Sequence, residues 1–381
     1  MKTALRAVLL LGLISGFASF PVRGTQSLDE VVEPRIPPDR KFYVCLRADP
    51  PPKIDGRLDD PAWRSAPWTE EFVDIEGSLR PAPRFRTRAK MLWDDNYFYV
   101  GAELEEPHLW ATLTERDSII FHDNDFEVFI DPEDDTFNYF ELEINALNTV
   151  WDLFLVKPYR DGGPAIHAWD IAGLKTAVAL DGTLNNPRDE DAGWTVEIAI
   201  PMDVLRAAIK DKRLPAPGDR WRVNFSRVQW RHEIRDGGYE KVKDPKTGHP
   251  APEDNWVWSP TGLVNIHYPE RWGFVELSGA AAGSEAPAFD MTDFDDDVKL
   301  ALREIYYKQR FRYAQTGTFS RDPAVLGLNL PPLKGWDDPP VIQVTESLFE
   351  AVYRKSDGSR TWHIRQDGYV WKTNTKKEKT P

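Results

Sequence analysis

The 381-residue chain contains one cysteine, Cys45, which excludes an internal disulfide. Because Cys45 lies well beyond the N-terminal apolar run, it is also no candidate for a lipid anchor. Basic residues are outnumbered, with 48 Lys and Arg against 62 Asp and Glu and a formal net charge of -14. Such an acidic chain is a poor partner for nucleic acid. Its stability must come from an apolar core or from bound ions.

Long hydrophobic runs are missing after the N-terminus. Lys2 and Arg6 precede an apolar run over residues 7–20, and small residues follow near Ala18 and Gly24. This is the pattern of a secretory signal peptide, and the run is too short to span a bilayer comfortably. We therefore predict a signal peptide over residues 1–24. The mature protein is expected to be exported, periplasmic or extracellular, and free of the membrane.

The chain also lacks recognisable nucleophile motifs. It has no G-x-S-x-G and no H-E-x-x-H, and Cys45 has no evident His partner. Glycoside hydrolysis would need two carboxylates about 5 to 10 Å apart, which acidic residues this numerous could supply by accident. Hydrolysis of O-glycosyl bonds therefore stays an alternative, and a non-catalytic function is favoured.

Aromatic residues are abundant, at 12% of the chain with 15 Trp, and many lie in short alternating segments. Because side chains alternate across a strand, this pattern predicts an aromatic-rich β core. Short strands at regular spacing, separated by turn residues, indicate an antiparallel β-sandwich. The expected strands lie at 42–46, 87–104 (a hairpin), 125–131, 140–145, 150–156, 174–180, 193–200, 220–231 and 272–277, with a helix over 202–210.

Two strands over residues 123–145 are joined by a loop of carboxylates. Phe126 is expected to face the core, whereas Glu127, Glu143 and Asn145 face the opposite side. Polar groups on a half-buried face need hydrogen-bond partners, and the hydroxyls of a polyhydroxylated ligand are one possibility. A solvated outer face of a sandwich is the other, and both interpretations stay open.

Acidic residues of the same segment are candidate ligands for a hard cation, because calcium prefers oxygen ligands. A solvated acidic loop explains them equally well. The calcium candidates are Asp123, Asp125, Asp131 and Asp134.

The composition changes at residues 278–287, which read S-G-A-A-A-G-S-E-A-P, and we predict a domain boundary there. Beyond it, an amphipathic helix over 295–316 and several short strands predict a small α+β extension. This extension is expected to pack on the sandwich or to contact a protein partner. The predicted units are a linker (25–40), the sandwich (41–278), a second linker (279–290), the extension (291–372) and a disordered tail (373–381).

Seven segments in the expected order resemble family 9 carbohydrate-binding modules, which belong to the DOMON-like sandwiches. They are I-D-G-R-L-D-D-P-A-W (54–63), A-K-M-L-W-D-D-N-Y-F-Y-V (89–100), D-N-D-F-E-V-F-I-D (123–131), L-K-T-A-V (174–178), G-W-T-V-E-I-A-I-P (193–201), V-N-F-S-R-V (223–228) and P-E-R-W-G (269–273). The resemblance implies a β-sandwich that binds an oligo- or polysaccharide without cleaving it, in support of carbohydrate catabolism. It also implies bound calcium.

The resemblance carries over to particular residues. Glu127 falls on the acidic position that accepts sugar hydroxyls, and Phe121-His122 stands where the family has one of two clamping Trp. The second Trp position falls near Ile266, beside His267 and Tyr268. The ligand-binding candidates are Phe121, His122, Trp169, His267 and Tyr268 as ring-bearing residues, with Glu127, Asn145 and Arg227 as polar partners.

Two further interpretations accompany these candidates. Arg227 is as well explained by a buried ion pair with Glu127 or Glu143 as by a ligand contact. Haem binding, known in some DOMON-like sandwiches, is an alternative function, although the chain has no C-x-x-C-H and few Met. Core packing is the better explanation for the Trp residues in strands or at turns, namely Trp63, Trp93, Trp194 and Trp221.

Overall fold

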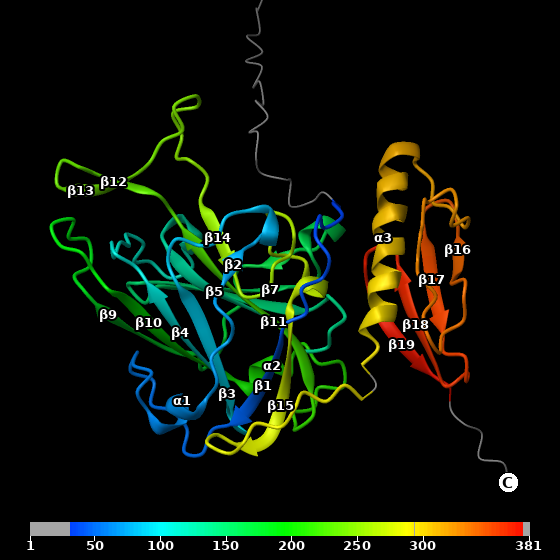
Figure 1. Cartoon of the computed structure of the whole chain (residues 1–381), viewed down its shortest axis with the longest axis horizontal. Coiled ribbons are helices and arrows are strands. Elements are labelled where there is room, and N and C mark those ends of the chain that lie inside the picture. The colour runs from blue at the N-terminus through cyan, green and yellow to red at the C-terminus, as the bar shows by residue number, and fades with distance from the viewer. Residues whose placement is uncertain (1–30, 293, 376–381) are drawn as a thin grey trace, which may run out of the picture.

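The computed structural model describes residues 31–292 and 294–375, so the predicted signal peptide lies outside the described residues. Thirteen strands of this part of the chain form one sheet that folds over itself as a β-sandwich (Figure 1). The predicted fold class is confirmed. The strands are β1 (Phe42–Arg47), β2 (Val73–Asp74), β3 (Thr87–Trp93), β4 (Tyr97–Glu105), β5 (Asp125–Asp131), β6 (Tyr139–Asn145), β7 (Val150–Leu155), β8 (Ala165–Ile166), β9 (Lys175–Asp181), β10 (Gly193–Pro201), β11 (Arg220–Gln229), β14 (Asp254–Val257) and β15 (Gly273–Ala281).

The strand order is β8-β7-β6-β5-β11-β15-β1-β3-β4-β10-β9, with β14 pairing to β11 and β2 pairing to β14. Most neighbours are antiparallel, as the sequence predicts. Strand β1 is different, because it runs parallel to both β15 and β3. It thereby joins the two halves of the sandwich.

The core lies between these halves and is rich in aromatic rings. Phe126 of β5 stacks on Phe225 of β11 with ring centroids 5.6 Å apart. The predicted alternation is confirmed, since the Phe126 face of β5 is fully buried in this core. The four Trp residues assigned to packing are each at most 4% exposed, namely Trp63, Trp93, Trp194 and Trp221.

A short helix, α1 (Pro61–Ser65), holds its loop against the outer face of β10. The buried carboxylate of Glu197 accepts three hydrogen bonds there, from Trp63 Nε1 (2.6 Å) and from the backbone N–H groups of Asp55 (2.7 Å) and Gly56 (2.6 Å). Gly56 has φ +90°, and a Cβ atom on it would come within 2.6 Å of the Val178 backbone. This position therefore requires glycine.

The remaining sandwich helices are short. Helix α2 spans only Met202–Leu205, against the predicted 202–210. Beyond Leu205 the N–H groups of Ala207, Ala208 and Ile209 bond three residues back, so the chain tightens into 3₁₀-type turns. The single-turn 3₁₀ helices are η1 (Gly77–Leu79), η2 (Ile120–His122), η3 (Tyr159–Asp161) and η4 (Pro269–Arg271).

The C-terminal extension is a helix laid on a four-stranded meander, as predicted. Helix α3 (Asp296–Thr316) packs between this meander and the sandwich (Figure 1). A separate hairpin, β12 (His232–Arg235) and β13 (Gly238–Lys241), projects from the sandwich (Figure 1). None of the helices within the described ranges is long and apolar enough to cross a membrane. The meander strands are β16 (Val341–Val344), β17 (Phe349–Arg354), β18 (Arg360–Arg365) and β19 (Val370–Asn374).

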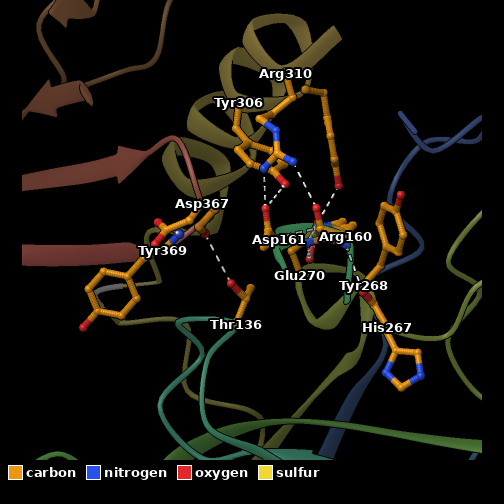
Figure 2. A network of polar contacts seen from close by, with 12 residues as sticks. Thr136, Arg160, Asp161, His267, Tyr268, Glu270, Tyr306, Arg310, Asp367 and Tyr369 are labelled. Atoms are coloured by element: carbon orange, nitrogen blue, oxygen red, sulfur yellow. Dashed lines mark hydrogen bonds and ion pairs between the residues drawn. The ribbon is translucent and has the colours of Figure 1, made fainter. Parts of the chain in front are cut away.

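Buried polar groups join the extension to the sandwich (Figure 2). Arg160 of η3 donates two hydrogen bonds to the Glu270 carboxylate of η4, at 2.8 and 2.9 Å. Tyr306 of α3 donates to Asp161 at 2.6 Å, and Arg310 donates to the same oxygen at 2.7 Å. Tyr307 donates to Glu270 at 2.5 Å. We call this set the junction network, and its members are Arg160, Asp161, Glu270, Tyr306, Tyr307 and Arg310.

Candidate functional site

The polar face of β5 and β6 is buried rather than solvated. Loops of the sandwich, including η2 and the segment around Ile266 to Trp272, cover this face together with its aromatic residues. The interpretation of a solvated outer face is therefore wrong. Four acidic side chains, which we call the carboxylate cluster, lie beneath this cover with exposed fractions of 0%, 6%, 5% and 1%, namely Asp125, Glu127, Glu141 and Glu143.

Strand register brings the cluster together. Glu127 and Glu143 are directly opposed across β5 and β6, and Asp125 and Glu141 are their diagonal neighbours. Carboxylate oxygens of Asp125, Glu127 and Glu143 lie within 4.8 Å of one another. Burial raises the pKa of Glu127 to about 7. Burial, together with repulsion from Glu127, raises the pKa values of Asp125, Glu141 and Glu143 well above the usual range.

An aromatic surface borders the cluster, formed by Phe121, His122, Trp151 and His167. The Phe121 ring lies 5.0 Å from the His122 ring and 6.4 Å from the Trp151 ring, measured between centroids. His167 stacks on Trp151 at 5.6 Å with an interplanar angle of 11°. Phe121 is half-buried, while His122 and His167 are exposed. The backbone N–H of Phe121 donates to Glu143 at 3.0 Å, which ties this surface to the cluster.

Two residues that sequence reasoning missed hold the η2 backbone. Trp230 Nε1 donates to the Phe121 carbonyl at 2.9 Å. Lys241 of β13 donates to the His122 carbonyl at 2.6 Å, and its Nζ lies 3.4 Å from the Trp230 ring centroid. Trp151 was also missed. Its signal was present, because alternation along β7 places it on the same face as Glu143, its partner in register.

The side-chain amide of Asn145 makes all its hydrogen bonds within the protein. Its amide nitrogen donates to the Leu113 carbonyl (2.9 Å) and to Asp123 (3.0 Å). Its amide oxygen accepts from the N–H groups of Leu147 and Thr149. The side chain is fully buried and holds the turn that follows β6.

Arg227 is separated from the cluster. It projects from the opposite face of β11 to Ser226, whose partner in register is Glu127. Its guanidinium pairs with Glu106 at 3.0 Å and also bonds to Thr87 and Gln229. The interpretation as a buried ion pair is confirmed, but the expected partners Glu127 and Glu143 were wrong.

The other ring-bearing candidates also lie apart from the aromatic surface. Trp169 packs on Phe140, with centroids 5.2 Å apart, at the edge of the main core. His267 and Tyr268 are buried beside the junction network, where the Tyr268 ring lies 3.9 Å from the Arg160 guanidinium (Figure 2). They were predicted as loop aromatics. Tyr268 is buried against Tyr307 of α3, whereas the His267 ring lies among the sandwich residues Phe129, Tyr139 and Tyr159.

All four predicted calcium ligands have partners within the chain, and Asp125 has one on Oδ1, the Val228 N–H at 3.1 Å. Asp123 accepts from Thr112, Leu113 and Asn145. Asp131 accepts backbone N–H groups of its own loop, and Asp134 pairs with Arg222 and Lys299. Within the described part of the chain the four do not converge as a metal-binding group. Asp125 alone belongs to such a group, with Glu127 and Glu143.

We expect His267 to make the fold sensitive to acid. Burial, reinforced by nearby Arg160, lowers its pKa from 6.5 to about 3. Below pH 6.5 the imidazole is protonated in the unfolded chain but stays neutral in the folded protein. Protonation therefore favours the unfolded state, and the free energy of unfolding decreases as the pH falls from 6.5 towards 3. Between pH 7 and pH 4.5 the loss should be about 2 to 3 kcal/mol of unfolding free energy.

Urea denaturation at both pH values checks this expectation. His267→Gln should show a smaller decline on acidification than the wild type, because Gln does not titrate. His249→Gln, at an exposed position, is the matched control and should retain the wild-type decline. An unchanged pH dependence in His267→Gln would contradict the prediction.

The fold is a β-sandwich, and one face of its sheet carries buried acidic residues bordered by aromatic rings. The chain matches the family described as "Carbohydrate family 9 binding domain-like" over residues 54–280. Since this match spans more than half of the chain, the protein belongs to that family. The match ends before α3, so the extension lies outside it.

Individual relatives are distant. Exoglucanase XynX of Acetivibrio thermocellus is 28% identical over 153 residues, which are 39% of this chain and 11% of that protein. A family 9 carbohydrate-binding module of Caldicellulosiruptor kristjanssonii, solved with cellotriose, is 18% identical, covering 66% of this chain and 100% of its own, with a TM-score of 0.39. A putative carbohydrate-binding protein of Bacteroides uniformis is 14% identical, covering 62% and 99%, with a TM-score of 0.43.

Proposed function

We infer that this chain is an exported, non-catalytic protein that binds an oligo- or polysaccharide through its sandwich, in support of carbohydrate catabolism. Family membership supports saccharide binding, and the aromatic surface around Phe121 supports its location. Flat rings pack against the C–H faces of a sugar, while polar groups at the rim pair with hydroxyls. The half-buried Phe121 ring supplies a ring face, and Trp151, which is 8% exposed, packs beneath the surface. The exposed imidazoles of His122 and His167 supply polar groups.

Hydrogen bonds within the protein fix the backbone of this surface before any ligand binds. The Phe121 amide and carbonyl bond to Glu143 and Trp230, and the His122 carbonyl bonds to Lys241. A surface fixed before binding loses little conformational entropy when a ligand arrives. Glu127, predicted as the acceptor of sugar hydroxyls, lies behind this surface in the carboxylate cluster. Its direct contact with the ligand stays a prediction, as do the hydrolase and haem alternatives.

Calorimetry of the full chain against a panel of mono-, oligo- and polysaccharides tests the function. For the glycan that binds, Phe121→Ala should weaken affinity by about tenfold or more, because it removes the central ring of the surface. Phe311→Ala, on the exposed side of α3, should leave the affinity unchanged. Lack of binding to every member of the panel, or equal affinity of wild type and Phe121→Ala, would sink the proposal.

A further inference from the structure

A second group of rings lies beside the aromatic surface, where hairpin β12–β13 (Figure 1) packs on the segment that follows β4. Trp110 of that segment lies 4.7 Å from His232 of β12, measured between ring centroids. His232 lies 5.9 Å from Tyr239 of β13, and Tyr239 lies 5.5 Å from His108. All four residues are half-buried, so each keeps part of its surface in solvent. We call these four residues the hairpin rings.

Lys241 of β13 joins the hairpin rings to the aromatic surface. Its Nζ donates to the His122 carbonyl at 2.6 Å and lies 5.7 Å from the Trp110 ring centroid. The same ammonium lies 3.4 Å from the ring centroid of Trp230, which in turn donates to the Phe121 carbonyl. Both ring distances are within the range of a cation–π contact. One ammonium group therefore contacts both sets of residues, and together they form one continuous surface.

The backbone on both sides of Trp110 is fixed by the connection between β9 and β10. The N–H of Leu109 donates to buried Asp191 at 2.8 Å, and the Leu109 carbonyl accepts the Asn185 N–H at 2.9 Å. The Asn185 side chain accepts from the Ala111 N–H at 3.1 Å and donates to the Ala111 carbonyl at 2.8 Å. Trp110 therefore extends from a backbone that is ordered before any ligand binds, which lowers the entropic cost of binding.

Core packing does not account for these rings. Trp110 and Tyr239 belong to none of the hydrophobic clusters formed by the described residues. The Trp110 ring instead meets the imidazole of His232 and the ammonium of Lys241, so it adds little to the apolar interior. Trp and Tyr are common at binding interfaces, because each combines a flat apolar ring with a polar N–H or O–H group. Recognition of a ligand therefore explains the position of Trp110 better than packing does.

Hydrogen-bond donors are available between the two sets of rings. The Lys241 ammonium has three N–H groups, and within the described part of the chain it makes one hydrogen bond, to the His122 carbonyl. Its other N–H groups are available to sugar hydroxyls, while the C–H faces of a sugar pack on flat rings. The order of ring, ammonium and ring from Phe121 through Lys241 to Trp110 matches this alternation of polar and apolar groups.

We propose that Trp110 forms a second saccharide subsite, so that one linear oligosaccharide packs one unit on Phe121 and a later unit on Trp110. Lys241 would bond to hydroxyls between them. Trp230 and Lys241 separate the two rings, so a further sugar unit is needed to reach Trp110. The ligand class is therefore a chain of several sugar units and not a free monosaccharide. This inference rests on the saccharide binding proposed above.

Calorimetry of the full chain against a length series tests the inference, with the monosaccharide to hexasaccharide of the glycan that binds in the panel. The wild type should bind the hexasaccharide at least about tenfold more tightly than the monosaccharide, because only the longer ligand contacts both subsites. Trp110→Ala should remove this gain and leave the affinity for the monosaccharide within about twofold of the wild type. The retained affinity for the monosaccharide also shows that the variant is folded.

Three further variants accompany this test. Trp110→Leu keeps an apolar side chain but removes the flat ring, so it should reproduce the loss if Trp110→Ala proves unstable. Phe121→Ala should weaken binding of both saccharides, because both use its subsite. Trp68→Ala is the matched control, since Trp68 is also half-buried and its ring packs on Arg88 and Lys90 of β3. This control should keep the full gain with length.

The length series separates failure of this inference from failure of the proposed function. Equal affinity of the wild type for both saccharides, or a gain with length that survives in Trp110→Ala and Trp110→Leu, would overturn the second subsite while saccharide binding stands. Equal weakening of both saccharides by Trp110→Leu in a folded protein would also overturn it, because Trp110 would then belong to a single subsite. Absence of binding at every length would overturn the proposed function, and the second subsite with it.

Discussion

Glu270→Gln is expected to lower the unfolding free energy by about 3 to 5 kcal/mol. Glu270 pairs with Arg160, whose side chain is fully buried, through two hydrogen bonds of 2.8 and 2.9 Å. Burial alone would raise the pKa of Glu270, but Arg160 and Arg303 outweigh it and lower that pKa to about 2. Removing the carboxylate charge leaves the buried Arg160 guanidinium with Asp161 alone as a counter-ion, at 3.5 Å from Nε, in place of the bidentate Glu270. Loss of such a buried partner costs far more than loss of a surface pair.

Urea denaturation at pH 7 measures this effect, and Glu103→Gln provides the matched control. Glu103 also pairs with two arginines, Arg86 and Arg88, but its side chain is 31% exposed. Solvent screens such a pair, so its loss should cost less than about 1 kcal/mol. Equal losses in the two variants would mean that the junction network contributes no more than an ordinary surface contact.

Glu197→Ala should destabilise the sandwich by a similar amount, about 3 to 5 kcal/mol. The carboxylate is the shared acceptor for Trp63 Nε1 and for the N–H groups of Asp55 and Gly56. Without it, three donors lose their partner in a buried loop, and each unsatisfied group costs roughly 1 to 3 kcal/mol unless water enters. Because Trp63 packs against the outer face of the sheet, the α1 loop should loosen together with it.

Two companion variants make this prediction specific. Trp63→Phe removes one of the three donors and keeps a large ring, so it should cost less than Glu197→Ala. Glu105→Ala removes an exposed glutamate from neighbouring strand β4 and should change the unfolding free energy by less than about 1 kcal/mol. Hydrogen exchange of the Asp55 and Gly56 amides gives a local readout. Undiminished protection of these amides in Glu197→Ala would contradict the assigned role.

The alternation of apolar and polar residues along the strands, together with the turn residues, was enough to predict most of the fold. Alternation placed Phe126 in the core and Glu127 on the other face, and both assignments are confirmed. Trp63 was expected to pack on the sheet, and it does. These outcomes depend on the period of a strand and on turn residues, which a single sequence displays directly.

The candidate site was less predictable because its environment is set by contacts distant in sequence. The burial of Glu127 depends on η2 and on the segment around Ile266, which both pack over this face of the sheet. Nothing in the local sequence of either segment predicts this packing. His267 is buried among Phe129, Tyr139 and Tyr159, which lie more than 100 residues earlier in the chain, so its burial cannot be read from the local sequence. Arg227 was assigned the wrong partners because its side of β11 follows from register with β5 and β14, while Glu106 lies 121 residues away.

The junction network also has a hydrodynamic consequence. Its members come from η3, η4 and α3, and the Arg160, Glu270, Tyr306 and Tyr307 side chains are all buried. A junction locked in this way leaves no free hinge at that interface, so the sandwich and the extension should tumble as one particle with a single rotational correlation time. A saccharide bound at the aromatic surface would then keep a fixed orientation relative to the β16–β19 meander. Any molecule that binds the meander would be held in a fixed orientation relative to that saccharide.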